Sequence, residues 1–208
     1  MNKLSTQALV KQLNQQTEIR FKIGDLVFID VCVKPFKMVS DATACWANHV
    51  GIVVDTAGGN VMVAESTFPF SKRTSLEKFI QRSTQGRVAV KRPRRAFTAE
   101  QEQAIVAAAD KRMGILYDTG FDLYSRRQFC SRFVYEVLQE AVGLTVGKVE
   151  NFATLLHQNP HAKLSFWRCW YFGLIPWQRR TVTPASVLRS TEIVSVCEFN
   201  LKGEEATC

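Results

Sequence analysis

The sequence predicts an α+β fold, in which a few helices pack on a cluster of antiparallel strands. Two β-rich runs, HVGIVV at 49–54 and NVMVAES at 60–66, flank a DTAGG segment typical of a hairpin turn. The helical patterns do not alternate regularly with strands, as they would in a doubly wound sheet. Of the 208 residues, 46% are hydrophobic and 22% charged, which is ordinary for a globular protein. A single domain over 1–208 is expected.

The first elements follow from periodicity and turn residues. An amphipathic helix is expected at 5–16, before a strand at 21–33 in which Gly24 and Asp25 form a turn. The next elements are expected in this order: a loop at 35–48, the hairpin, a short helix at 75–82 with Ser75 as its cap, and a strand at 87–91.

Two longer helices carry clearer signals. Thr98 and Gln101 form a capping-box pattern, an Ala-rich run supplies helix propensity, and Gly114 is expected to end this helix. Another helix begins near Cys130 with its apolar residues on one face, and Gly143 is its predicted stop. Three short elements complete the chain: helices at 151–158 and 185–190, and a strand at 192–199.

Charge and cysteine usage limit the possible functions. Lys and Arg number 27 and Asp and Glu 19, and the resulting net charge of +8 favours anionic partners without specifying one. The six cysteines contain no CxxC pair, which argues against a zinc ribbon or a thioredoxin-type site. No metal ion or cofactor is expected. The chain shows no signal-peptide run and no stretch of about 20 apolar residues, so a cytoplasmic, bacterial-type protein with free thiols is predicted.

Cys130 is the candidate nucleophile. At the start of a helix, its sulfur lies near unsatisfied backbone N–H groups and the positive end of the helix dipole, which lowers a thiol pKa. The same N–H groups can stabilise an oxyanion. The alternative is a small, inert, buried cysteine. Cys45 lies in the predicted loop and Cys32 in the predicted strand, and neither position offers this activation.

His49 and Glu65 are the candidate partners of this cysteine. If Val53 pairs with Val61 in the hairpin, His49 lies directly opposite Glu65 on the same face of the sheet. A carboxylate beside an imidazole fixes its tautomer and stabilises its charged form. The other face of this strand is expected to point into the core. The alternative is a histidine with a purely structural role.

Five motifs together resemble the permuted papain-like NlpC superfamily, in particular its YaeF/YiiX group of amidases. They are GDLVF at 24–28, HVGIVV at 49–54, VAES at 63–66, YDTGFDL at 117–123 and FCSRFVYEVL at 129–138. As in the permuted group, the histidine strand precedes the cysteine helix. The resemblance implies a circularly permuted papain-like fold, with an antiparallel sheet packed against the nucleophile-bearing helix. It covers a core at about 24–142, leaving an aromatic and basic extension at about 145–208.

The resemblance also implies roles for individual residues. Cys130 would be the nucleophile, His49 the base and then the acid, and Glu65 the residue that orients His49. Tyr117 would bind substrate or assist the oxyanion, or be a packing tyrosine. Arg132 replaces the acidic residue that usually follows the Cys-Ser pair, which leaves the charge preference for substrate open. Asp118 is interpreted as a structural hydrogen-bonding residue.

The implied activity is that of a thiol hydrolase that cleaves an amide or ester through an acyl-enzyme. The alternatives are a lipid-directed acyltransferase and a catalytically silent binder of an acylated or anionic ligand. The expected substrates are small peptides, cell-wall fragments or lipid-like acyl compounds.

Two further features of the sequence bear on which partners the protein binds. The basic clusters, among them KRPRR at 91–95, lack the interleaved aromatics of a nucleic-acid site, so nucleic acid is not the expected partner. The aromatic and basic stretch at 165–180 has the chemistry of a membrane-interface segment, or forms a segment packed over the active-site cleft.

Overall fold

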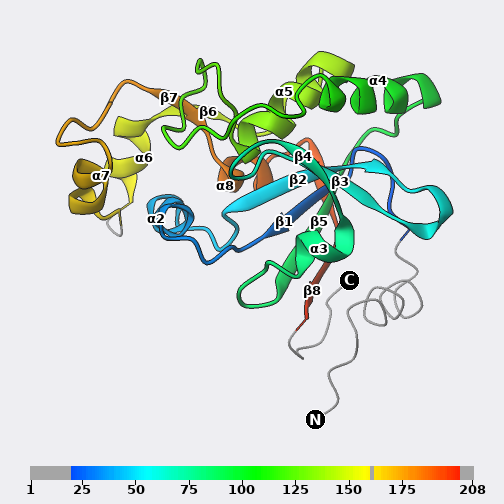
Figure 1. The fold of residues 1–208 in the computed structure, drawn as a ribbon, viewed down its shortest axis with the longest axis horizontal. Coiled ribbons are helices and arrows are strands. Elements are labelled where there is room, and N and C mark those ends of the chain that lie inside the picture. Colours follow the sequence, from blue (N-terminus) through cyan, green and yellow to red (C-terminus); the bar gives the residue numbers. More distant parts are fainter. Residues whose placement is uncertain (1–19, 160–161, 202–208) are drawn as a thin grey trace, which may run out of the picture.

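The structure, a computed structural model, describes residues 20–159 and 162–201. Its centre is a six-stranded antiparallel sheet in the order β4-β3-β2-β1-β5-β8 (Figure 1). The strands are β1 (Leu26–Ile29), β2 (His49–Asp55), β3 (Met62–Glu65), β4 (Lys72–Ser75), β5 (Arg87–Pro93) and β8 (Ile193–Asn200). The α+β class predicted from the sequence is confirmed.

Helices cover both faces of the sheet and one of its ends. The helices are α2 (Lys34–Thr43), α3 (Leu76–Ile80), α4 (Ala99–Asp110), α5 (Cys130–Val142), α6 (Phe152–Gln158), α7 (Leu164–Trp170) and α8 (Pro184–Leu188), with a 3₁₀ turn, η1, at Ala57–Gly59. Strands β6 (Val149–Asn151) and β7 (Arg180–Val182) form a small separate pair. Among the described residues, no helix is long and apolar enough to cross a membrane.

The two faces of the sheet bury separate apolar clusters. Alternate residues of β2, including Val50, Ile52 and Val54, point into the larger cluster with the apolar face of α5, as predicted for this strand. Val53 points into the smaller cluster, where it packs with Phe79 of α3 and others. Helices α4 and α5 therefore lie on one face and α3 on the other (Figure 1).

Several predicted ends and caps are confirmed. Thr98 and Gln101 form a reciprocal capping box, and the Ser75 side chain accepts a hydrogen bond from the backbone of Lys78. Helix α5 begins at Cys130 and is capped by Gly143, whose φ of 63° favours glycine. Helix α4 ends at Asp110 rather than near Gly114, which lies in the turn that follows. The predicted helix at 5–16 lies outside the described residues.

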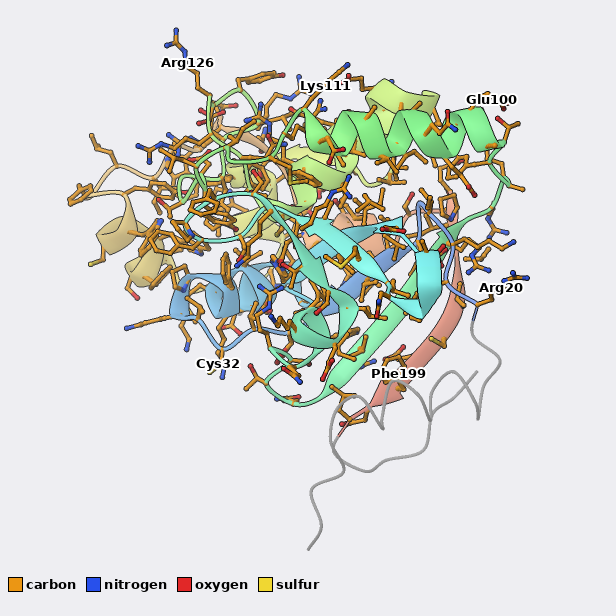
Figure 2. The ribbon with its side chains drawn as sticks, turned by 45° about the vertical axis from the view of Figure 1, so that its right-hand side comes forward. Arg20, Cys32, Glu100, Lys111, Arg126 and Phe199 are labelled. Atoms are coloured by element: carbon orange, nitrogen blue, oxygen red, sulfur yellow. The ribbon has the colours of Figure 1, made fainter. Side chains whose placement is uncertain are left out.

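The predicted loop at 35–48 was wrong, because most of it forms α2. Pro35 lies in the first turn of this helix, where its missing N–H costs nothing, so it starts the helix instead of preventing it. Phe36, Met38 and Ala42 are buried against the large cluster. The predicted strand at 21–33 is also shorter than expected, since β1 ends at Ile29 and leaves Cys32 exposed at the surface (Figure 2).

The predicted hairpin register was wrong by two residues. Val53 pairs with Val63, not Val61, and the register shifts between Val53 and Asp55. Because side chains alternate with a period of two, an error of two residues keeps each side chain on its predicted face. His49 and Glu65 therefore share a face, but they meet diagonally rather than directly opposite each other.

The segment after Val142 completes the large cluster and the sheet. Strand β8 pairs with β5 at the sheet edge. Trp167 of α7 and Val182 of β7 are buried in the large cluster, with exposed fractions of 4% and 1%. This C-terminal segment therefore forms one wall of a cavity that Cys130 also lines.

Candidate active site

Cys130 is the first residue of α5 and is buried, with an exposed fraction of 3%. Phe129 precedes it in an extended conformation and its carbonyl accepts the first helical hydrogen bond, from Phe133. No side chain caps this end, so backbone N–H groups of the first turn are available beside the sulfur. The apolar residues of α5 hold the helix against the sheet, and Cys130 Sγ lies 3.9 Å from the backbone oxygen of Asn48.

His49 is the first residue of β2 and is almost fully buried. Its Nε2 lies 2.6 Å from Oε2 of Glu65, and its ring stacks on Phe79 at 5.4 Å between centroids. The other ring nitrogen, Nδ1, is buried and makes no hydrogen bond with the described residues. The Cys130 thiol lies close enough to this imidazole for each group to shift the pKa of the other. The structure thus brings together the cysteine, histidine and glutamate that the sequence singled out.

Glu65 is held by two residues that the sequence did not single out. Arg82, which follows α3, donates from Nη2 to both carboxylate oxygens at 2.8 and 2.7 Å, and Thr74 of β4 donates its hydroxyl at 2.7 Å. Strand β4 was not predicted, and the position of Arg82 after a short helix gave no sign of this contact. These bonds satisfy a fully buried carboxylate, which would otherwise be costly.

The pKa values of the three groups are shifted toward an ion pair. Burial alone would raise the pKa of the Cys130 thiol, but the His49 imidazole and the backbone N–H groups of Val50 and Ser131 outweigh burial, so the pKa is lowered. Burial would lower the pKa of His49, but Cys130 and Glu65 raise it to about 9. The pKa of Glu65 falls to about 2, because His49 and Arg82 overcome the effect of burial. The lowered pKa of Cys130 and the raised pKa of His49 both favour a thiolate and an imidazolium over two neutral groups.

Tyr117 lies beside this pair. A single β-bridge to Gln128 fixes it next to the start of α5, and its buried hydroxyl has no hydrogen-bond partner among the described residues. Burial first, and then the nearby Cys130, raise the pKa of Tyr117 well above its usual value. The hydroxyl therefore stays protonated and can donate a hydrogen bond to an oxygen atom bound near the thiol.

Asp118 and Arg132 organise the loop between α4 and α5. The Asp118 carboxylate accepts hydrogen bonds from the backbone of Gly120 and Asp122, which confirms its structural interpretation. Arg132 pairs with Glu136 at 2.7 Å and donates to the carbonyl of Ser125 at 2.7 Å. Arg132 is thus engaged in holding the loop, and its charge is not directed at the thiol.

Two spaces adjoin the site. The first is a cavity of about 40 Å³ that Cys130 and Trp167 help to line. The second is a groove of about 430 Å³ that His49 and Thr67 help to line. Phe36, Tyr117 and Phe121 line both spaces, so the cysteine and histidine face adjacent compartments.

Cys45, Cys32 and Cys169 lack this environment. Cys45 follows α2, and burial raises the pKa of its thiol despite the nearby Arg189 and Arg87. Cys32 and Cys169 are exposed. The sequence-based preference for Cys130 over Cys45 therefore agrees with the electrostatic environments of the two thiols.

Comparison with protein families places the chain in a class. Residues 20–197 match a family described as permuted papain-like amidase enzymes, the YaeF/YiiX or C92 family. The chain therefore belongs to this family of papain-like amidases. The match extends beyond Val142, so the C-terminal segment is included in it.

A relative and a solved structure support the same assignment. The chain is 26% identical to the uncharacterised protein YiiX of Escherichia coli strain K12 over 175 residues, which cover 84% of this chain and 85% of YiiX. The crystal structure of the metalloprotein YiiX from Escherichia coli O157:H7 matches with a TM-score of 0.79 and 26% identity, over 86% of this chain and 97% of that one. The fold is thus the permuted papain-like fold predicted from the sequence motifs.

The described residues of this chain contain no group of three or more His, Cys, Asp or Glu side chains arranged to hold a metal ion. His49 and Glu65 are instead bonded to each other.

Proposed function

We propose that the protein is a cysteine hydrolase that cleaves an amide or ester bond through an acyl-enzyme on Cys130. The observation that carries this proposal is the buried pairing of Cys130 at a helix start with a His49 imidazole whose far nitrogen is bonded to Glu65 at 2.6 Å. A thiolate next to an imidazolium combines a nucleophile with a proton donor, which acyl transfer from an amide needs.

The proposed reaction has two halves. The Cys130 thiolate attacks the carbonyl carbon, and the resulting oxyanion accepts hydrogen bonds from a backbone N–H of the first turn of α5 and from the Tyr117 hydroxyl. His49 then gives its proton to the leaving nitrogen or oxygen as the bond to carbon breaks. Neutral His49 next takes a proton from water, whose oxygen attacks the thioester. Release of the acid restores the thiolate and the imidazolium.

Glu65 acts through His49. Its carboxylate fixes which ring nitrogen carries the second proton and stabilises the positive charge, while Arg82 and Thr74 hold the carboxylate in place. Tyr117 is proposed as an oxyanion donor rather than a packing residue, because its hydroxyl is buried without a partner.

The test is a search for the acyl-enzyme. Wild type and Cys130→Ala are incubated with butyryl esters and with cell-wall peptides and lipid extracts, and the intact proteins are weighed by mass spectrometry. An adduct on wild type that is absent from Cys130→Ala supports the proposal. If substrate binds to wild type but forms no adduct and no product, the protein is a silent binder. Transfer of the acyl group to an added amine in preference to water identifies an acyltransferase.

The cytoplasm is the proposed compartment. Cys32, Cys45, Cys130 and Cys169 are in no disulfide, and thiols persist in a reducing environment. Fractionation of cells that express the natural chain tests this placement.

A further inference from the structure

The cavity beside Cys130 is uncharged and mostly apolar. Its lining contains no Lys, Arg, Asp, Glu or His, and most of its wall is aromatic or aliphatic. The aromatic residues come from segments far apart in the chain: Phe36, Phe121, Phe129, Phe152 and Trp167. A charged group placed here would lose its hydration without gaining a partner. The cavity therefore selects an uncharged apolar group.

The size of the cavity limits that group. Its volume is about 40 Å³, whereas an apolar cavity of about 150 Å³ holds benzene in another protein. By proportion, the cavity takes on the order of two carbon atoms. A short acyl chain meets this limit, whereas a fatty acyl chain exceeds it.

The groove beside His49 differs from the cavity in that charged residues line it. The charged residues of its lining, apart from His49, are Lys72 and Arg82, and no acidic residue lines it. Lys72 is exposed and makes no ion pair with the described residues. Arg82 donates hydrogen bonds to Glu65 from Nη2, whereas its Nε is buried and has no hydrogen-bond partner among the described residues. The charge of Arg82 is paired with Glu65, so the positive charge of the groove that no described acidic residue neutralises is that of Lys72.

The positions of Cys130 and His49 indicate which space receives the acyl group of a substrate and which receives its leaving group. Cys130, which binds the acyl carbon, lines the cavity, and His49, which gives a proton to the leaving group, lines the groove. The carbonyl then lies at the boundary formed by Phe36, Tyr117 and Phe121, next to the Tyr117 hydroxyl.

We infer that the substrate joins a short, uncharged acyl group to a leaving group that carries a negative charge. This inference rests on the proposed acyl-enzyme chemistry of Cys130. Each leaving group of this kind has an anion near the scissile bond. An acylated amino acid supplies a carboxylate there, and an acylated phosphate compound supplies a phosphate. Lys72 is the specificity residue, since its charge has no partner in the described protein.

The test uses matched aryl esters. Butyryl esters of 4-hydroxybenzoate and 4-hydroxybenzamide differ only in charge, and a butyryl ester of 4-hydroxyphenyl phosphate distinguishes phosphate from carboxylate. Wild type is expected to prefer one or both anionic esters over the neutral ester by about fivefold in kcat/KM. Lys72→Glu should lower or reverse this ratio. Lys78→Glu makes the same charge change on the exposed side of α3 and should keep the wild-type ratio.

A second series tests the cavity. Acetyl, butyryl, octanoyl and succinyl esters of 4-hydroxybenzamide are compared, and the acetyl and butyryl esters should exceed the other two in kcat/KM by about tenfold or more. Leu155→Ala, which widens the cavity wall, should shift the preference toward octanoyl. If all esters are cleaved through Cys130 without these preferences, the substrate inference is wrong and the proposed function stands. If no ester is cleaved through Cys130, the proposed function fails.

The segment at 163–180 exposes apolar and basic side chains. Helix α7 lies at one end of the longest axis of the molecule (Figure 1), and the turn after it exposes Phe172 by 96% and Leu174 by 83%. The sequence from 151 to 191 has no Asp or Glu but five Lys or Arg residues. Trp167 on the inner side of α7 is buried against the cavity. The segment therefore packs over the site on one side and presents apolar and basic groups on the other.

We propose that this outer side docks on an anionic lipid surface. Exposed Phe172 and Leu174 can enter the interface while Lys163, Arg168 and Arg180 pair with lipid headgroups. The positive charge is complementary to an anionic bilayer, and an exposed leucine beside an exposed phenylalanine fits acyl chains better than nucleic-acid bases.

Vesicle sedimentation tests this docking. The full chain should bind vesicles of phosphatidylcholine with 30% phosphatidylglycerol several-fold more than phosphatidylcholine alone. Phe172→Ser with Leu174→Ser should remove most of this binding, and Arg168→Glu should weaken it more than Lys78→Glu, which changes the net charge equally. Equal binding to both vesicles overturns the proposal. So does binding to duplex DNA that matches vesicle binding and is unaffected by the Phe172 and Leu174 changes.

Discussion

Cys130 and Cys45 have the same side chain in two environments, and the pKa values of their thiols are shifted in opposite directions. Burial by itself would raise the pKa of both thiols. For Cys45, nearby arginines and one backbone hydrogen bond reduce the effect of burial but do not overcome it. For Cys130, contact with a charged imidazole and with the N–H groups around the start of α5 overcomes it. Proximity to positive charge therefore matters less than a direct partner inside a buried site.

The largest expected effect of this difference is on turnover. Cys130→Ser should lower kcat/KM for a butyryl ester by about 10³-fold or more, because a hydroxyl is not activated as a thiolate is. Cys45→Ser should keep it within about twofold. The two rates are compared after circular dichroism shows that both variants are folded. A large loss in Cys45→Ser alone would contradict the assignment of the nucleophile.

Glu65→Gln should lower kcat/KM by about 10- to 100-fold, since the His49 charge loses its buried partner. The upper pH limit of activity should also move down, because the raised pKa of His49, about 9 in the wild type, depends in part on this carboxylate. The pH profile of kcat/KM measures both effects. Glu192→Gln, at an exposed position, is the control, and an unchanged pH profile in Glu65→Gln would remove Glu65 from the mechanism.

The two thiols should also differ in alkylation by iodoacetamide. At pH 7 Cys130 should label at least about tenfold faster than Cys45, because its lowered pKa increases the fraction of thiolate and the raised pKa of Cys45 decreases it. As the pH rises, Cys45 ionises and the ratio of rates should fall. Peptide mass spectrometry after timed labelling gives the rates. His49→Ala should slow labelling of Cys130 only; equal rates for both cysteines in the wild type would refute an activated thiolate.

The smallest expected change comes from Tyr117→Phe, which removes one hydroxyl and keeps the ring. Loss of one of at least two oxyanion donors should lower kcat by about tenfold, at the weak end of such effects because the backbone donor remains. Tyr124→Phe makes the same change at an exposed tyrosine of the same loop and should leave kcat unchanged. If the two variants have equal kcat values, Tyr117 is a packing residue.

Local patterns predicted much of the fold. The capping box of Thr98 and the glycine stop at Gly143 depend on residues within a few positions of each other, and both were found where the sequence placed them. Helix α2 was missed because Pro35 suggested a loop, and the burial of Phe36 that stabilises the helix depends on distant segments. The small pair of β6 and β7 and helix α7 were missed for the same reason.

The sequence by itself determined the start of the cysteine helix and the shared face of His49 and Glu65, because helical and strand periodicities are local. The alternation of side chains along a strand made the face correct even though the register was not. Only the tertiary structure decided that Arg82 and Thr74 hold Glu65, and that the cavity and the groove meet at Phe36 and Tyr117. These contacts join residues from separate helices, strands and loops, and their positions follow from how the helices pack on the sheet rather than from any local pattern.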